Sequence, residues 1–187
     1  SLKLLIEGYY DSGTQLMQPV KSNQGMGSST TDVADITVEL RNATTHALVA
    51  SATTVLSSNG TAVCSFPTAA AGSYYVAVKH RNAIETWSAT TLAIGAVTAS
   101  YDFTTAASKA YGSNLMQLAP NVWALYSGDT NQDGVIEYTD YTLWEADANA
   151  FVFGDYATDL NGDGFVEYSD YTIWETNSNN FVSSITP

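Results

Sequence analysis

Two short acidic segments near the end of the chain carry the residues best suited to chemistry. Each begins Asp-x-Asn-x-Asp-Gly, at Asp129 and again 30 residues later at Asp159. In such a segment alternate side chains turn inward toward one point, and the glycine at position 6, Gly134 or Gly164, permits a sharp turn that a Cβ would hinder. The converging groups are all oxygen donors, which suits a hard cation.

Continuing each segment to twelve residues gives two complete sets of calcium ligands. Positions 1, 3, 5, 9 and 12 supply side-chain oxygens, with position 9 acting directly or through water, and position 7 supplies its backbone carbonyl. The first set is Asp129, Asn131, Asp133, Val135, Glu137 and Asp140, and the second is Asp159, Asn161, Asp163, Phe165, Glu167 and Asp170. Calcium suits this flexible loop better than magnesium, which requires a tight octahedron. The sequence therefore predicts two Ca²⁺ ions whose binding also supplies folding energy.

The two segments belong to a tandem duplication in which 13 of 23 aligned positions are identical. Each copy is expected to be one structural unit with the same role. Helices are predicted over 140–149 and 170–179, because aromatic and small residues recur there at helical spacing. These stripes are Tyr141, Trp144, Ala148 and Phe151, and Tyr171, Trp174, Ser178 and Phe181. At loop position 8, Ile136 and Val166 are expected to pair across the two loops.

The charge distribution divides the chain near residue 125. The protein has 187 residues and a net charge of −13, and all six Lys and Arg residues lie at or before Lys109. Residues 1–124 hold seven acidic and six basic side chains, whereas residues 125–187 hold twelve acidic and none basic. We therefore expect two domains, 1–124 and 125–187. The acidic end would repel nucleic acid or an anionic membrane surface, and no apolar run is long enough for membrane insertion.

Residues 1–124 have the pattern of an all-β domain. Short apolar or alternating runs, separated by Gly, Asn, Ser and Pro, predict strands. The candidate strands are 2–9, 34–40, 47–56, 61–66, 74–80, 86–93, 97–103 and 122–126. Their number and spacing predict a two-sheet β-sandwich around one hydrophobic core. Asn59-Gly60 predicts a type I′ hairpin turn.

Few residues are left for catalysis. Cys64 is the only cysteine, and its alternation with Ala62 and Phe66 favours a buried structural thiol. There are two histidines, and nearly every clustered carboxylate lies in one of the two loops. Because no acid–base pair remains outside the loops, we expect a protein that is not an enzyme.

The tandem loop–helix units resemble a type I dockerin, an EF-hand-like (F-hand) calcium-binding module that attaches secreted or cell-surface proteins to a cohesin. The resemblance covers residues 128–182. In that family loop positions 10 and 11 contact the cohesin, which implies protein–protein interaction through Tyr138, Thr139, Tyr168 and Ser169. Position 10 usually carries a small hydroxyl residue and is Tyr in both copies here. The metal-binding pattern is complete in both copies.

A second resemblance lies in the preceding domain. Residues 71–78, Ala-Gly-Ser-Tyr-Tyr-Val-Ala-Val, resemble a strand of immunoglobulin-like and transthyretin-like bacterial surface domains. The order of the two parts resembles an X-module followed by a dockerin. The expected fold is therefore a mainly β, Ig-like or transthyretin-like sandwich followed by a small α-helical module. Because the chain begins at Ser1 rather than Met, we expect a C-terminal segment of a longer secreted or cell-surface bacterial protein, binding a cohesin-like or other surface protein.

Two alternative functions stay open. The C-terminal module could be a calcium-rigidified stalk or spacer with no specific partner. The sandwich could bind a glycan through Tyr74, Tyr75, Trp87 and Tyr101, because carbohydrate-binding modules present aromatic side chains to sugar rings. The basic run 79–81, Lys-His-Arg, could dock the acidic C-terminal module, contact a ligand, or be a solvated strand end.

Overall fold

An antiparallel five-stranded sheet is the framework of the molecule in the computed structural model, which describes all residues from 1 to 187. The strand order is β5-β4-β7-β8, and β9 also pairs with β7. These strands are β4 Asp32–Asn42, β5 Leu48–Ser57, β7 Gly72–His80, β8 Ala83–Trp87 and β9 Leu92–Ile94. Ile36, Val38 and Leu40 of β4 are buried, as their alternation predicts.

Smaller strand pairs complete the β part. The second sheet has the order β10-β1-β6, with β1 Leu2–Lys3, β6 Thr61–Ala62 and β10 Tyr101–Asp102. Two further ladders pair β2 Tyr10–Asp11 with β3 Leu16–Met17, and β11 Met116–Ala119 with β12 Val122–Ala124. The short helices of this part are η1 Glu7–Tyr9, α1 Val20–Asn23, η2 Ala107–Lys109 and η3 Tyr111–Ser113.

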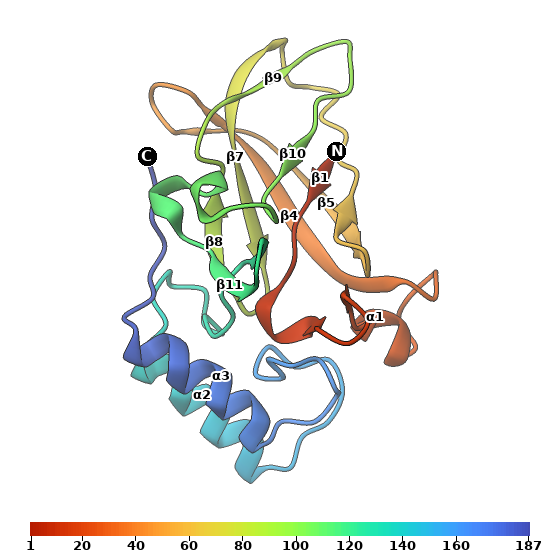
Figure 1. Cartoon of the computed structure of the whole chain (residues 1–187), viewed down its shortest axis with the longest axis vertical. Helices are drawn as coiled ribbons and strands as arrows, with labels where there is room; N and C mark the ends of the chain where they lie inside the picture. Colours follow the sequence, from red (N-terminus) through yellow and green to blue (C-terminus); the bar gives the residue numbers. More distant parts are fainter.

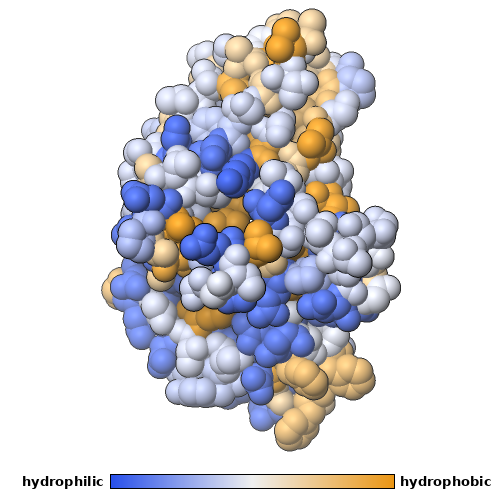
Figure 2. All heavy atoms as spheres, turned by 45° about the vertical axis from the view of Figure 1, so that its right-hand side comes forward, coloured by the Kyte–Doolittle hydropathy of each residue, from blue (hydrophilic) through white to orange (hydrophobic).

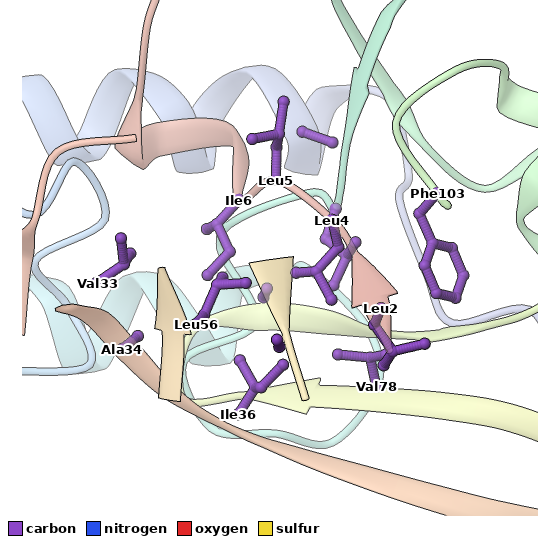
Figure 3. Close-up of a cluster of buried hydrophobic side chains, with 14 of the residues drawn as sticks. Leu2, Leu4, Leu5, Ile6, Val33, Ala34, Ile36, Leu56, Val78 and Phe103 are labelled. Carbon is purple, nitrogen blue, oxygen red and sulfur yellow. The ribbon is translucent and has the colours of Figure 1, made fainter. Parts of the chain in front are cut away.

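The main hydrophobic core lies between the N-terminal segment and the large sheet (Figure 3). It contains 22 buried residues, all between positions 2 and 125. Figure 3 shows side chains of the N-terminal segment meeting those of β4, β5 and β7, among them Leu2, Leu4, Ile6, Ile36, Leu56 and Val78. Fully burying one such Leu or Ile side chain is worth about 1.5–3 kcal/mol. The prediction of a mainly β, sandwich-like fold is confirmed.

Several strands are shorter than predicted. The strand expected over 2–9 pairs at β1 and in one isolated bridge between Ile6 and Leu125 before it turns into η1. The strands expected over 61–66 and 97–103 shrink to β6 and β10. The segment 86–93 is divided between β8 and β9. Beyond β1 the backbone forms only single contacts, such as the hydrogen bond from Leu4 N–H to the Gly60 carbonyl at 2.9 Å. The alternation of apolar residues therefore predicted which side chains are buried, although the strand pairing ends earlier than predicted.

The predicted hairpin at Asn59-Gly60 is wrong. Of the two residues only Gly60 has a positive φ, 84°, whereas a type I′ turn needs both. The Asn59 Oδ1 instead accepts hydrogen bonds from the backbone N–H and the hydroxyl of Thr61, at 3.0 and 2.7 Å. The following strand β6 pairs with β1 and not with β5.

Two helices, α2 Tyr138–Asn149 and α3 Tyr168–Asn179, lie side by side at the lower end of the molecule (Figure 1). Each starts two residues before the predicted first residue, directly after the glutamate at loop position 9. The chain after α3 runs back along the β part, where Asn114 Nδ2 donates to the Ser183 carbonyl at 2.9 Å. No helix has both the length and the apolar composition required to cross a membrane.

Candidate functional site

The aspartate at loop position 12 is buried in both copies and ties the loop to its helix. In the first loop, Asp140 Oδ1 accepts hydrogen bonds from the backbone N–H groups of Thr130 and Asn131, at 2.7 and 3.1 Å. Its Oδ2 accepts from the N–H of Glu137 at 2.9 Å, which forms half of a capping box at the start of α2. Asp170 makes the three equivalent bonds in the second loop.

The aspartate at loop position 1 is equally buried. Asp129 Oδ2 accepts a hydrogen bond from the Gly134 N–H at 3.2 Å, while its Oδ1 is buried without a hydrogen-bond partner. Asp159 accepts from the Gly164 N–H at 3.0 Å, and its other oxygen accepts from a second backbone N–H. Gly134 and Gly164 both have φ of 89°, the left-handed conformation predicted at position 6.

The side chains at positions 3 and 5 brace the turn. Asn131 Oδ1 accepts from the backbone N–H of Asp133 at 2.9 Å, and Asp133 Oδ1 accepts from the N–H of Val135 at 3.0 Å. Asn161 and Asp163 repeat both bonds. The position 7 side chains, Val135 and Phe165, are exposed and make no contribution to the interior of either loop.

Burial makes these loops electrostatically costly without a cation. It is the main reason that the pKa values of Asp129, Asp159 and Asp170 rise to about 6, and for the first two the aspartate at position 12 of the same loop adds to the rise. Residues 125–187 contain no basic side chain to offset this charge. Arg81 of the β part lowers the pKa of Asp159, but this effect is smaller than the effect of burial. A bound cation would remove the penalty.

The donor set fits calcium, although the carboxylates are not gathered into a ready-made cluster. No three His, Cys, Asp or Glu side chains lie together as a metal site, because the carboxylates turn toward backbone N–H groups. Each loop nevertheless places two buried aspartates, one amide oxygen and a further carboxylate along one tight turn. The unpartnered Asp129 Oδ1 is the kind of buried oxygen that a cation satisfies.

The residues at loop positions 10 and 11 lie in the first turn of each helix. Tyr138 and Tyr168 are 68% and 70% exposed. The hydroxyls of Thr139 and Ser169 accept hydrogen bonds from the amides of the position 3 asparagines, at 2.9 and 2.7 Å. The structure therefore places all four proposed partner-binding residues beside the loops, with the two tyrosines exposed to solvent.

The two helices are joined by reciprocal tryptophan hydrogen bonds. Trp144 Nε1 donates to the Glu167 carbonyl at 3.1 Å, and Trp174 Nε1 donates to the Glu137 carbonyl at 3.0 Å. Each indole thus reaches the residue that precedes the other helix. Spacing predicted that the tryptophans share a helix face with tyrosines, but not that they cross to the other repeat.

The last residue of each predicted aromatic stripe, Phe151 or Phe181, does not lie on the helix face that carries the stripe. Phe151 and Phe181 are 86% and 88% exposed, because α2 and α3 end at Asn149 and Asn179 and the two phenylalanines adopt φ of 51° and 55°. This change of backbone direction turns the rings away from the helix pair.

The predicted pairing of Ile136 with Val166 is replaced by pairing with other segments. Ile136 N–H donates to the Val182 carbonyl at 2.9 Å. In the second loop, Phe165 forms a bridge with Phe153 instead. The first loop is therefore closed by the end of the chain after α3, and the second loop is closed by the segment that follows α2.

Polar contacts dock the second loop onto the β part. Arg81 forms an ion pair with Asp155, so one residue of the predicted basic run contacts the acidic segment. Asn82 Nδ2 donates to the Asp159 carbonyl at 3.1 Å and to the Tyr9 hydroxyl at 3.3 Å. His80 is buried beside these groups, and burial lowers its pKa to about 3. The sequence pattern did not predict that Tyr9 and Asn82 take part in this contact.

A further contact involves α3. Asn177 is buried, and its Nδ2 donates to Glu7 Oε2 at 2.7 Å and to the Ser127 carbonyl at 2.8 Å. Burial raises the pKa of Glu7. The hydrogen bond between Asn177 and Glu7 joins residues 170 positions apart in sequence, so the spacing of residues could not predict it.

The aromatic residues considered for glycan binding do not share one open face. Trp87 is only 4% exposed, with the Arg41 guanidinium 5.3 Å from its ring centroid. Tyr74 and Tyr101 pack against the core, whereas Tyr75 contacts Trp87. Cys64 is half-buried against the same core, and burial raises the pKa of its thiol.

Comparisons with known proteins support the fold. No protein family matches the chain, and no curated protein is a significant relative. Similar solved structures include a C-terminal interface mutant and an N-terminal interface mutant of a type II cohesin–X–dockerin complex from Acetivibrio cellulolyticus. Both matches have 21% identity and a TM-score of 0.50. They cover 95% and 96% of this chain and 92% and 94% of the matched chains.

Proposed function

We propose that this chain is a non-catalytic attachment segment of a secreted or cell-surface protein, whose residues 125–187 bind two Ca²⁺ ions and a cohesin-like partner. The observation that carries the proposal is the duplicated loop, in which the same aspartates are buried in both copies without a neighbouring basic residue from their own segment. Such a cost repeated twice is reasonable only if a cation offsets it.

The first ion would be held by the oxygens of the first loop, and the second by those of the second loop. The ligands are the side chains at positions 1, 3, 5, 9 and 12 and the carbonyl at position 7, from Asp129, Asn131, Asp133, Val135, Glu137 and Asp140, and from Asp159, Asn161, Asp163, Phe165, Glu167 and Asp170. A bound Ca²⁺ supplies charge neutralisation and loop rigidity. The protein contributes the tight turns and the two helices that follow.

The proposed division of the chain is a β-sandwich of residues 1–124 that supports a dockerin-like module of residues 125–187. The similarity to both cohesin–X–dockerin complexes supports this arrangement, since at 95% coverage the aligned region extends into the helix pair. The proposed partner-binding residues are Tyr138, Thr139, Tyr168 and Ser169. Exposed tyrosines suit this role because they bury a large area at small entropic cost.

A calcium-rigidified spacer is the second candidate. The buried polar contacts of Asn82 and Asn177 favour it, because they hold the helix pair firmly against the β part whether or not a partner binds. The two functions share the calcium sites and differ only in the partner.

Calcium titration by isothermal calorimetry tests the metal sites. The full chain is expected to bind two Ca²⁺ ions, and the double variant Asp129→Ala/Asp159→Ala is expected to lose both and the helical signal in circular dichroism that depends on them. Glu145→Gln is the matched control, because Glu145 is an exposed carboxylate of α2 outside both loops. A double variant that bound calcium like the parent would refute the metal assignment.

Retention on immobilised chain tests the partner. Purified type I and type II cohesin domains are passed over residues 1–187 in calcium and in EDTA. We expect retention only in calcium and its loss in Tyr138→Ala/Tyr168→Ala, but not in Val97→Ala, which changes an exposed residue of the β part. Calcium binding with no retention of either cohesin type would favour the spacer.

A further inference from the structure

Two hollows lie next to each other on the outer face of the helix pair, one for each repeat. The first, of about 390 Å³, is lined by Tyr138, Tyr141, Glu145, Tyr171 and Trp174. The second, of about 410 Å³, is lined by the equivalent residues, Tyr168, Tyr171, Glu175, Tyr141 and Trp144. Each hollow thus consists of four aromatic rings and one carboxylate, and Tyr141 and Tyr171 belong to both.

The aromatic walls are held in place by contact across the repeats. Tyr141 and Trp174 have ring centroids 5.2 Å apart, as do Tyr171 and Trp144. The outer walls are Tyr138, stacked on Tyr141 at 5.5 Å, and Tyr168, stacked in the same way on its neighbour at 5.6 Å. Because both indole N–H groups are bonded to backbone carbonyls, the tryptophans are fixed before any ligand arrives. Both hollows are therefore preformed.

A carboxylate stands at the same place in each hollow. Glu145 Oε1 accepts a hydrogen bond from the Tyr141 hydroxyl at 2.7 Å, and Glu175 Oε1 accepts one from the Tyr171 hydroxyl at 2.8 Å. Neither glutamate forms an ion pair, and residues 125–187 contain no Lys or Arg. Each carboxylate therefore lies beside aromatic faces without a cationic partner.

We propose that each hollow accepts one cationic side chain, with arginine preferred to lysine, from the surface of a protein partner. Aromatic faces attract cations, and a planar guanidinium can stack on a tyrosine or tryptophan while donating to a carboxylate. The inference rests on the proposed function in that it names the chemistry of the partner surface. That surface presents two basic side chains, one for each repeat.

The charge of the hollows argues against other occupants. An apolar side chain would remove water from a glutamate without replacing its hydrogen bonds, which is unfavourable. A sugar ring could stack on the tyrosines, but it would leave the negative charge uncompensated. A neutral oligosaccharide is therefore the competing ligand in the experiment.

Nuclear magnetic resonance of the indole N–H groups tests the proposal in the full chain with calcium present. The chain has four tryptophans, of which Trp144 and Trp174 line the hollows whereas Trp87 and Trp123 lie in the β part. Nα-acetyl-arginine methylamide is titrated against its neutral isostere, the citrulline compound, and against cellotetraose. We expect saturable shifts of the Trp144 and Trp174 signals with the arginine compound alone.

Two variants that each remove one negative charge from α2 distinguish binding in the hollows from attraction by the overall negative charge of residues 125–187. Glu145→Gln is expected to weaken arginine binding at its hollow about fivefold, because it removes the negative charge that would pair with the guanidinium. Asp147→Asn removes the same charge two residues further along α2, outside the hollows, and is expected to leave the affinity unchanged. Equal weakening by the two variants would overturn the proposal, as would equal shifts with arginine and citrulline, shifts with cellotetraose alone, or no shifts at all.

The result is distinguishable from failure of the proposed function. Calcium binding without arginine-dependent shifts rejects the cation hollows and leaves the calcium module intact. Arginine-dependent shifts in a chain that binds no calcium would reject the metal sites while supporting the hollows.

Discussion

At the scale of single residues, the same aspartates have one structural task and one proposed task. Asp140 and Asp170 cap the helices, and they also stand at the position proposed for the last calcium ligand of each loop. The ordinary calcium loop has glutamate at this position. The shorter aspartate fits here because its carboxylate already bonds to the backbone of both the loop and the helix start. A single substitution there is therefore expected to affect metal binding and helix stability together.

Calcium binding is expected to release protons near pH 6. Three aspartates have a pKa of about 6 in the metal-free chain, against an ordinary value of 3.8, so they are about half protonated at pH 6 and must ionise to bind the metal. Roughly one to two protons per chain should leave at pH 6, and almost none at pH 8. Calorimetry in buffers of different ionisation enthalpy measures this number.

The same pKa shifts determine how the stability of the metal-free fold changes with pH. A folded-state pKa above the unfolded value means that the folded state binds more protons between about pH 4 and 6, so these aspartates favour the metal-free fold as the pH falls through 6. Calcium affinity changes in the opposite direction. Calcium binding at pH 6 without proton release would contradict the raised pKa values.

At the scale of the elements, both helices end in the same unusual way. The bonds from Phe151 N–H to the Ala148 carbonyl and from Val152 N–H to the Asp147 carbonyl form a Schellman motif after α2, and α3 ends with the equivalent pair. The residue with positive φ in this motif is usually glycine, but here it is phenylalanine. Figure 2 shows hydrophobic residues protruding at the lower end of the molecule, the end that holds the helix pair.

Replacing these phenylalanines with glycine is expected to stabilise the helix pair. Phe151→Gly and Phe181→Gly should each raise the free energy of unfolding by roughly 0.5–1 kcal/mol, because the strain of a positive φ is removed and little ring contact is lost. Urea unfolding in calcium measures the change.

Alanine is the control at the same two positions. Phe151→Ala and Phe181→Ala also remove the ring but keep a Cβ, so they are expected to give no gain. If alanine stabilised as much as glycine, the cause would be removal of the exposed ring and not relief of backbone strain.

At the scale of the whole molecule, the helix pair and the β part meet in a close, polar contact. Gly8 of η1 lies against the second loop so closely that a Cβ there would clash with the Leu160 carbonyl oxygen. Nearby, Asn82 and Asn177 are fully buried and bonded across the contact. This surface fixes the second loop and α3 relative to the sheet, leaving the aromatic hollows open.

Loss of the Asn82 amide is expected to weaken that contact. Asn82→Ala removes the donor to Asp159 and Tyr9 and should lower the free energy of unfolding by about 1–3 kcal/mol, because buried acceptors lose their partner. Denaturant unfolding followed by circular dichroism measures the change. Asn23→Ala is the control, since Asn23 is exposed at the end of α1. If the Asn82→Ala variant unfolded at the same denaturant midpoint as the parent protein, the contact would contribute nothing to the free energy of unfolding.

Local patterns predicted most of what depends on near neighbours. The repeated Asp-x-Asn-x-Asp-Gly placed both tight turns, with Gly134 and Gly164 in the left-handed conformation. Alternation in β4 identified its core face. Both properties arise within a few residues of chain, where side-chain geometry and backbone sterics are enough to decide the outcome.

Tertiary packing decided the rest. Which segment closes each loop, how Trp144 and Trp174 cross to the opposite repeat, and why Phe151 leaves the aromatic stripe all depend on contacts between distant residues. The same is true of Asn82 and Asn177, whose buried amides have partners 77 and 170 positions away. Periodicity cannot encode such pairs, because the free energy of a buried hydrogen bond depends on a partner that only the folded chain brings near.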